Sequence, residues 1–165
     1  MKALICVDCQ NYHMTGGSMV ISDGDKIIPV INELLPKFDL VIFTKKQLNE
    51  NIIDFETDLH KDIDFSKCKK DFYIFKRKSS NVSDSDINKF LEKRNVTDVY
   101  IVGLALDQAV ADTAIDAVMN GFKTVVIEDA TRPINEDINK TLKIFKETGI
   151  FLIESWELDM FNLIK

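Results

Sequence analysis

The chain has 165 residues, 45% of them hydrophobic, which suits one domain, residues 1–165, with a sizeable buried core. Its formal net charge of −6 argues against nucleic acid and anionic membranes as partners, because recognition of phosphate depends on clustered Lys and Arg. The chain also lacks both an apolar segment of the roughly 20 residues that cross a bilayer and a signal-peptide pattern after Met1, so we expect a cytoplasmic protein.

Short apolar segments alternate along the chain with segments of helical periodicity. The segments that read as buried strands are, in chain order, Ala3–Val7, Leu40–Phe43, Phe72–Phe75, Val99–Val102, Thr124–Ile127 and Ile150–Ile153. Apolar residues at helical spacing predict helices around Ile27–Leu35, Ile87–Leu91, Ala111–Val118, Ile134–Phe145 and Ser155–Leu163. This alternation of strands and helices predicts an α/β fold. It has three layers, with a doubly wound, mostly parallel six-stranded sheet and helices on both of its faces.

The residues that follow each predicted strand are the candidates for a functional site. In a doubly wound sheet, the ligand crevice lies outside the carboxyl ends of the strands. Asp8 ends the first strand, where an ionised carboxylate is costly unless it is paired or faces the crevice, and Lys76 follows the third. An Asp and a Lys at neighbouring strand ends also suit a structural salt bridge, so the pair alone does not indicate catalysis.

Two segments carry longer motifs. The stretch LICVDCQNYHMTGGSMVISDGDKIIPVINELLPKFDLVIFT places Asp8, Gln10 and Asn11 after an apolar strand, followed by a Gly-Gly turn and a Gly-Asp pair before the first helix. The stretch VGLALDQAVADTAIDAVMNGFKTVVIEDAT has a Gly-Leu-Ala-x-Asp turn, then Thr-Ala-x-Asp-Ala. Both resemble the isochorismatase-like cysteine hydrolase superfamily, and its nicotinamidase (pyrazinamidase) branch most closely. The resemblance implies the isochorismatase-like hydrolase fold and, for an active member, hydrolysis of small amides.

The resemblance also implies a Cys–Asp–Lys triad, whose thiolate attacks an amide carbonyl. The Asp corresponds to Asp8, the Lys to Lys76 and the Cys to Ala109. Backbone amides near Ala105 and Ala109 would form the oxyanion hole, and the peptide bond between Leu104 and Ala105 is expected to be cis. Since a methyl group has neither a lone pair nor a proton to lose, the covalent step of the family cannot occur at Ala109.

The nicotinamidase branch holds a metal ion through an Asp-x-His pair after the second strand and a further His. The corresponding positions here are Lys46, Leu48 and Ile52, and none of these side chains is a metal ligand. We therefore expect no metal or other cofactor, and Lys46 could supply positive charge in its place. Gln10 is expected to line the pocket with Lys46, and His13 either lines it or serves the loop that contains it.

Other cysteines are not expected to replace the missing nucleophile. The chain has three, Cys6, Cys9 and Cys68, without the paired spacing of a zinc site or a disulfide framework. Strand alternation turns Cys9 away from Asp8, and places Cys6 on the same face as Asp8 but deeper in the sheet. Both are more consistent with core packing.

Three interpretations of Ala109 remain open. The first is a member without the family's activity, which binds a small, amide-type molecule or acts as an assembly or regulatory partner. The second is an active hydrolase with an unconventional nucleophile, for example a water molecule activated by Asp8. The third is an active hydrolase whose cysteine was deliberately replaced by Ala109. By analogy with the family, we expect a homo-oligomer, either a dimer or a tetramer.

Overall fold

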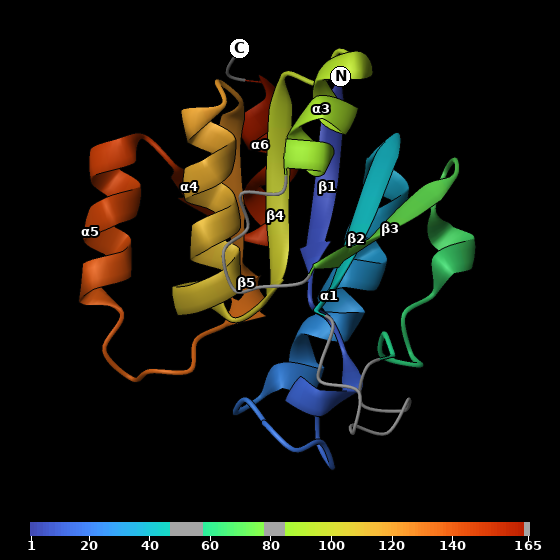
Figure 1. The fold of residues 1–165 in the computed structure, drawn as a ribbon, viewed down its shortest axis with the longest axis vertical. Helices are drawn as coiled ribbons and strands as arrows, with labels where there is room; N and C mark the ends of the chain where they lie inside the picture. Colours follow the sequence, from blue (N-terminus) through green and yellow to red (C-terminus); the bar gives the residue numbers. More distant parts are fainter. Residues whose placement is uncertain (47–57, 78–84, 164–165) are drawn as a thin grey trace.

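A six-stranded sheet forms the centre of the computed structural model, which describes residues 1–46, 58–77 and 85–163 (Figure 1). The strands are Lys2–Val7 (β1), Leu40–Lys46 (β2), Phe72–Arg77 (β3), Asp98–Leu104 (β4), Lys123–Arg132 (β5) and Phe151–Ile153 (β6). They lie in the order β3-β2-β1-β4-β5-β6, and every neighbouring pair is parallel. The predicted doubly wound α/β fold is confirmed, because the chain builds one half of the sheet outward from β1 and the other half outward from β4.

Helices cover both faces of this sheet. They are Ile27–Leu34 (α1), Ser85–Lys93 (α3), Ala111–Met119 (α4), Asn139–Thr148 (α5) and Leu158–Leu163 (α6), with short 3₁₀ turns at Asn11–His13, Gly24–Lys26, Leu35–Lys37, Phe65–Lys67 and Ser155–Glu157. In Figure 1, α3, α4 and α5 lie in front of the sheet, while α1 and α6 lie behind it. The molecule therefore has the three layers predicted from the sequence.

Strand alternation divides the buried side chains between two cores. Leu4 of β1 packs on the side of α1 and α6, whereas Ile5 packs on the side of α3, α4 and α5. Because apolar side chains fill both sides, the central strands read as continuous apolar runs in the sequence. In the described ranges no helix is long and apolar enough to span a bilayer.

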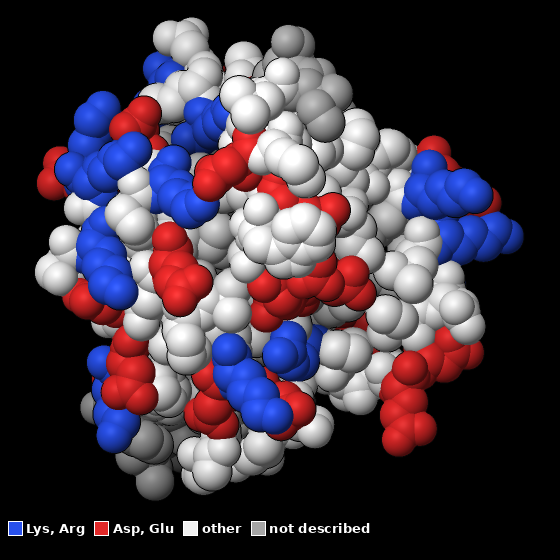
Figure 2. Space-filling view, turned by 180° about the vertical axis from the view of Figure 1, so that it is seen from behind, with Lys and Arg blue, Asp and Glu red and all other residues white. Residues whose placement is uncertain are grey.

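The face that carries α1 and α6 is covered by charges of both signs. Figure 2 shows acidic side chains gathered near its middle, with basic side chains distributed around them. Among the residues coloured there, this face offers no continuous basic surface of the kind that binds nucleic acid.

Helix α5 begins later than the sequence predicted. Apolar spacing placed its start near Ile134, but the helix starts at Asn139. The backbone amides of Ile134 and Asn135 donate hydrogen bonds to the carboxylate of Asp107, at 2.8 and 3.0 Å. This segment is therefore held against the carboxyl end of β4 and not wound into the helix.

The carboxyl ends of β1 and β4 approach each other unusually closely. Gly103 has a φ of +112°, and a β-carbon at this position would overlap the carbonyl oxygen of Val7. Only glycine supplies both this backbone conformation and this close contact. The contact sets the position of the turn that follows β4.

Candidate active site

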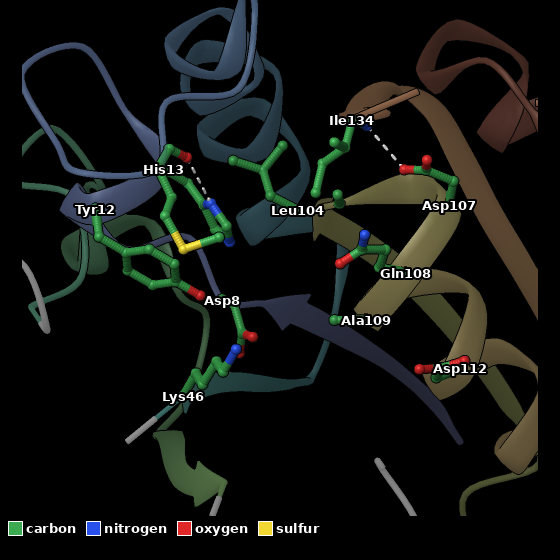
Figure 3. A pocket seen from close by; sticks show the side chains of 12 residues that line it. Asp8, Tyr12, His13, Lys46, Leu104, Asp107, Gln108, Ala109, Asp112 and Ile134 are labelled. Carbon is green, nitrogen blue, oxygen red and sulfur yellow. Dashed lines mark hydrogen bonds between the residues drawn. The ribbon is translucent and has the colours of Figure 1, made fainter. Parts of the chain in front are cut away.

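A cavity of about 310 Å³ opens at the carboxyl ends of β1, β2 and β4 (Figure 3). Its wall is formed by Asp8, Tyr12, His13, Met19, Lys46, Leu104, Ala105, Asp107, Gln108, Ala109, Asp112 and Ile134. This is the edge of the sheet where the sequence placed the ligand crevice. The wall includes Asp8, His13, Lys46, Ala105 and Ala109 from the predicted set, but neither Gln10 nor Lys76.

Asp8 lies immediately after β1 and is only 1% exposed. Its backbone turns sharply there, with a φ of +46°. The hydroxyl of Thr44 donates to Asp8 Oδ1 at 2.7 Å and accepts from the Asp8 backbone N–H at 3.1 Å. One side chain of β2 thus holds both the backbone and the carboxylate of Asp8, which is how a buried carboxylate is tolerated at this position.

Lys46, the last residue of β2, directs its ammonium group toward the Asp8 carboxylate (Figure 3). Lys46 and Thr44 are two residues apart in the strand, so their side chains lie on the same face of the sheet. Thr44 already contacts Asp8 from that face. Strand geometry therefore places a cation beside the carboxylate.

Gln10 supports the cavity from behind and does not line it. It is fully buried, and its side-chain amide bonds the Lys46 backbone twice: Oε1 accepts from Lys46 N–H at 2.6 Å and Nε2 donates to Lys46 O at 3.1 Å. This differs from the expectation that Gln10 contacts a ligand. The amide satisfies the backbone groups at the end of β2, which would otherwise lack a strand partner there.

Lys76 lies away from the cavity. It is exposed, and in the β2–β3 register it pairs with Lys45, whose ammonium lies 3.0 Å from Asp58. Partners in register share a face, and Lys45 and Lys46 point to opposite faces because they are neighbours in a strand. The resemblance implied that Lys76 lies beside Asp8. In the structure Lys46 lies there instead, and Lys76 belongs to the other face of the sheet.

The turn after β4 has an unusual backbone. The peptide bond between Leu104 and Ala105 is cis, as the resemblance implied. A wide helical turn, Leu106–Val110, follows and is kinked at Gln108, whose φ of −135° and ψ of −105° are not helical. The carbonyl of Ala105 accepts from the N–H groups of Gln108 and Val110, at 3.1 and 3.0 Å.

Ala109 presents its methyl group at the end of this turn, across the cavity from Asp8 and Lys46 (Figure 3). Thr113, one turn further along α4, donates its hydroxyl to Ala109 O at 2.6 Å and fixes the residue at the start of the helix. A reactive side chain at this position would face a ligand. The side chain that stands there has no group able to attack one.

Two acidic residues of the wall were not singled out from the sequence. Asp107 accepts hydrogen bonds from the backbone of Ile134 and Asn135, and although burial opposes ionisation, these bonds lower the pKa of its carboxyl group. Asp112 lies in the first turn of α4. Asp107 matches the Asp of the family's turn motif, so the resemblance could have identified it, whereas nothing in the sequence marks Asp112.

His13 has both of the roles left open by the sequence. It is buried, lines the cavity, and its Nδ1 lies 3.1 Å from the carbonyl oxygen of Met19. Since a carbonyl oxygen only accepts, Nδ1 carries the proton of this bond. The imidazole thus ties the loop that contains Met19 to the wall.

The buried cysteines do not form part of the wall. Cys6 and Cys9 are fully buried, and Cys9 Sγ donates to Val7 O at 3.6 Å. Burial, with a smaller contribution from the neighbouring Asp8, raises the pKa of the Cys9 thiol well above its usual range. A thiol in this setting is a poor nucleophile.

The residues at the family's metal position do not fit a metal ion. Lys46 is the first of the three positions, and Leu48 and Ile52 lie outside the described residues. Within the described part of the chain, no group of three His, Cys, Asp or Glu side chains could hold a metal. An ammonium group repels a cation, and aliphatic side chains offer no lone pair, so the chemistry of this donor set excludes coordination here.

Comparison with known proteins identifies the family. Residues 2–146 match the isochorismatase domain. The chain belongs to the isochorismatase family. Nicotinamidase of Saccharomyces cerevisiae is 44% identical over 77 residues, which span 45% of this chain and 36% of the yeast protein. Nicotinamidase of Acinetobacter baylyi is 28% identical over 183 aligned residues, covering 86% of this chain and 85% of the relative.

Among solved structures, pyrazinamidase of Pyrococcus horikoshii in complex with zinc superposes with a TM-score of 0.82 and 29% identity, covering 93% of this chain and 98% of that one. The predicted resemblance to the nicotinamidase branch of the isochorismatase family is therefore confirmed. That relative was solved in complex with zinc, whereas the position at which the resemblance implies the first metal ligand is Lys46 in this chain.

Proposed function

We propose that this isochorismatase-family chain binds a small, amide-type ligand in the cavity and does not carry out the family's covalent hydrolysis. The observation that supports this is the methyl group of Ala109, which lies in the wall opposite Asp8. Formation of an acyl-enzyme needs a nucleophile at that point. Among the residues that the structure describes, the wall contains no thiol and no Ser or Thr hydroxyl, and Cys6 and Cys9 are fully buried outside it.

The rest of the cavity supports retained binding. Its volume of about 310 Å³ suits a ligand of one ring with a small substituent. Asp8, Lys46 and His13 supply polar groups that converge on the same space. A cavity of this kind is held open by the fixed turn after β4 and by the Gln10 bonds to β2.

The test is to measure nicotinamide binding and turnover in the same preparation. Isothermal titration calorimetry with nicotinamide should give saturable binding, and an ammonia-release assay should show no turnover above a protein-free blank. Ammonia release by the wild-type protein that Asp8→Asn abolishes would refute the proposal. The Asn side chain keeps an oxygen to accept from Thr44, so this variant is expected to fold.

A second candidate is a hydrolase whose cysteine has been replaced by Ala109. The kinked turn after β4 favours it, because this turn places residue 109 in the cavity wall, where a nucleophile would face a ligand. Ala109→Cys separates the two candidates. If this single change restores ammonia release, the second candidate is correct. We expect no turnover, because Lys46 stands at the first metal position that the resemblance implies and Lys76 is not part of the cavity wall.

A matched control for Ala109→Cys is Met119→Cys. Met119 is 80% exposed at the end of α4, the helix that follows the Ala109 turn, so it adds a thiol to the same protein outside the cavity. Ammonia release by both variants would reflect an unspecific effect of the thiol.

We further infer a cytoplasmic protein, folded as one domain over residues 1–165, that forms a homo-oligomer. The basis is analogy with the family, whose members commonly form dimers or tetramers. Light scattering coupled to size-exclusion chromatography tests the assembly, and a single monomeric species would contradict it.

A further inference from the structure

We propose that Lys46 determines the ligand specificity of the cavity, because together with Asp8 it recognises a neutral primary carboxamide without the help of a metal ion. This inference rests on the binding function proposed above. It names the residue that distinguishes the amide from the corresponding acid.

The first step is the pairing of a donor with an acceptor. The Lys46 ammonium has only protons to donate, and the Asp8 carboxylate has only lone pairs to offer. Both groups border the same cavity, and the ammonium points toward the carboxylate. A primary carboxamide has the complementary pattern, since its carbonyl oxygen accepts from Lys46 while its NH₂ donates to Asp8.

The second step is that the arrangement is fixed before a ligand arrives. Thr44 holds Asp8 Oδ1 at 2.7 Å, and Gln10 holds both backbone groups of Lys46. Gln10 and Thr44 are both fully buried. A ligand therefore meets a carboxylate and a lysine whose backbones do not need to be reordered, which favours affinity.

The third step is the charge of the wall. Asp107 and Asp112 line the same cavity as Asp8, and Lys46 is its one lysine or arginine among the described residues. The described part of the wall thus carries more carboxylates than cationic side chains. A ligand carboxylate would face Asp8 without a proton between the two oxygens, so an acid is disfavoured relative to its amide.

The fourth step concerns the metal position. Lys46 stands at the first of the family's three metal positions, and the donor set there does not fit a metal ion. An ammonium at this point supplies one positive charge and its hydrogen bonds without a metal. Ligand binding by this protein is therefore expected to be independent of divalent ions.

The experiment compares nicotinamide with nicotinate, which differ only in carrying a carboxamide or a carboxylate. Calorimetry at neutral pH in the presence of EDTA should show nicotinamide binding about 100-fold more tightly than nicotinate. Addition of zinc should leave the affinity for nicotinamide unchanged. Tighter binding on addition of zinc would overturn the metal-independent part of the proposal.

Lys46→Met removes the ammonium and keeps much of the side-chain length. We expect it to weaken nicotinamide binding by about 30-fold or more, the loss of one charge-assisted hydrogen bond. Lys46→Arg, which retains the charge, should recover part of the affinity. The matched control is Lys45→Met, which removes the neighbouring lysine and its contact with Asp58 on the other face of the sheet, and should leave the affinity within about twofold.

Asp8→Asn tests the other half of the pair. The Asn amide can donate to a carboxylate, so nicotinate should gain affinity relative to nicotinamide. Thermal melts of every variant show whether it is folded.

The outcomes separate this inference from the proposed function. If the folded wild-type protein binds neither compound, the proposed binding function fails. If it binds both equally, or if Lys46→Met behaves like Lys45→Met, binding stands but Lys46 does not determine specificity. Discrimination that depends on Lys46 and reverses with Asp8→Asn supports the inference.

Discussion

The Thr44 hydroxyl stabilises the buried carboxylate of Asp8, and the substitution Thr44→Val tests this. The substitution keeps the shape of a fully buried side chain but removes the bond to Asp8 Oδ1 at 2.7 Å. It also removes one of the two acceptors of the Asp8 N–H, the hydroxyl at 3.1 Å, and leaves the Thr44 carbonyl oxygen at 3.2 Å. A hydrogen bond to a charged group contributes about 1.5–3 kcal/mol to stability. We expect the free energy of unfolding to fall by about 2–3 kcal/mol, which corresponds to a decrease in Tm of about 4–12 °C for a chain of this size.

Urea denaturation followed by circular dichroism measures this change, and Thr124→Val is the matched control. Thr124 is also buried in a strand, at 1% exposure, but its hydroxyl donates to a neutral acceptor, Phe122 O, at 3.1 Å. Loss of a bond between neutral groups is expected to cost about 1 kcal/mol. If the two variants lose equal stability, the Thr44 bond does not stabilise a buried charge and the argument is wrong.

Three further predictions concern other parts of the fold. Gly103→Ala should lower the free energy of unfolding by about 3 kcal/mol, because the added methyl group overlaps Val7. Gly121→Ala, at a positive φ but in open space, should lower it by only about 1 kcal/mol, and equal decreases measured by urea denaturation would contradict the role of the Val7 contact. The hydrogen bonds to Asp107 lower the pKa of its carboxyl group in the folded state, so its contribution to stability is present above pH ~4 and is lost as the pH falls through this folded-state pKa. Asp107→Asn should therefore make the free energy of unfolding depend less on pH in this acid range, and an unchanged dependence would refute the argument. Burial raises the pKa of Tyr100 to about 12, so Tyr100→Phe should remove a phenol that ionises near this pH in an ultraviolet titration. An unchanged titration would contradict the assignment.

The fold was predictable because its signals are local. Each strand, such as β1 or β4, is buried on both faces and appears in the sequence as an uninterrupted apolar run. The alternation of strands and helices then leaves few possible topologies. The start of α5 was not predictable, because a long-range bond between Asp107 and the backbone of Ile134 overrides its helical spacing.

The site was predictable only in part. Asp8 and Ala109 follow from motifs whose positions are fixed by adjacent strands, and both lie in the cavity wall. The choice between Lys46 and Lys76 depends on which face each side chain takes, and this follows from strand register, which the sequence does not display. Met19 lies in the wall because its loop folds back onto His13, a contact without a local signal.

The two adjacent lysines at the end of β2 give the Thr44 hydroxyl a significance beyond the stability of the Asp8 carboxylate. A slip of one residue in this strand would turn Lys45 to the face that now carries Lys46 and would leave one lysine on each face. Lysine charge alone therefore does not distinguish the correct alignment from the incorrect one. The slip would also move Thr44 away from Asp8 and break its bond to the carboxylate, so a hydroxyl two residues earlier decides which of two chemically identical side chains meets the ligand.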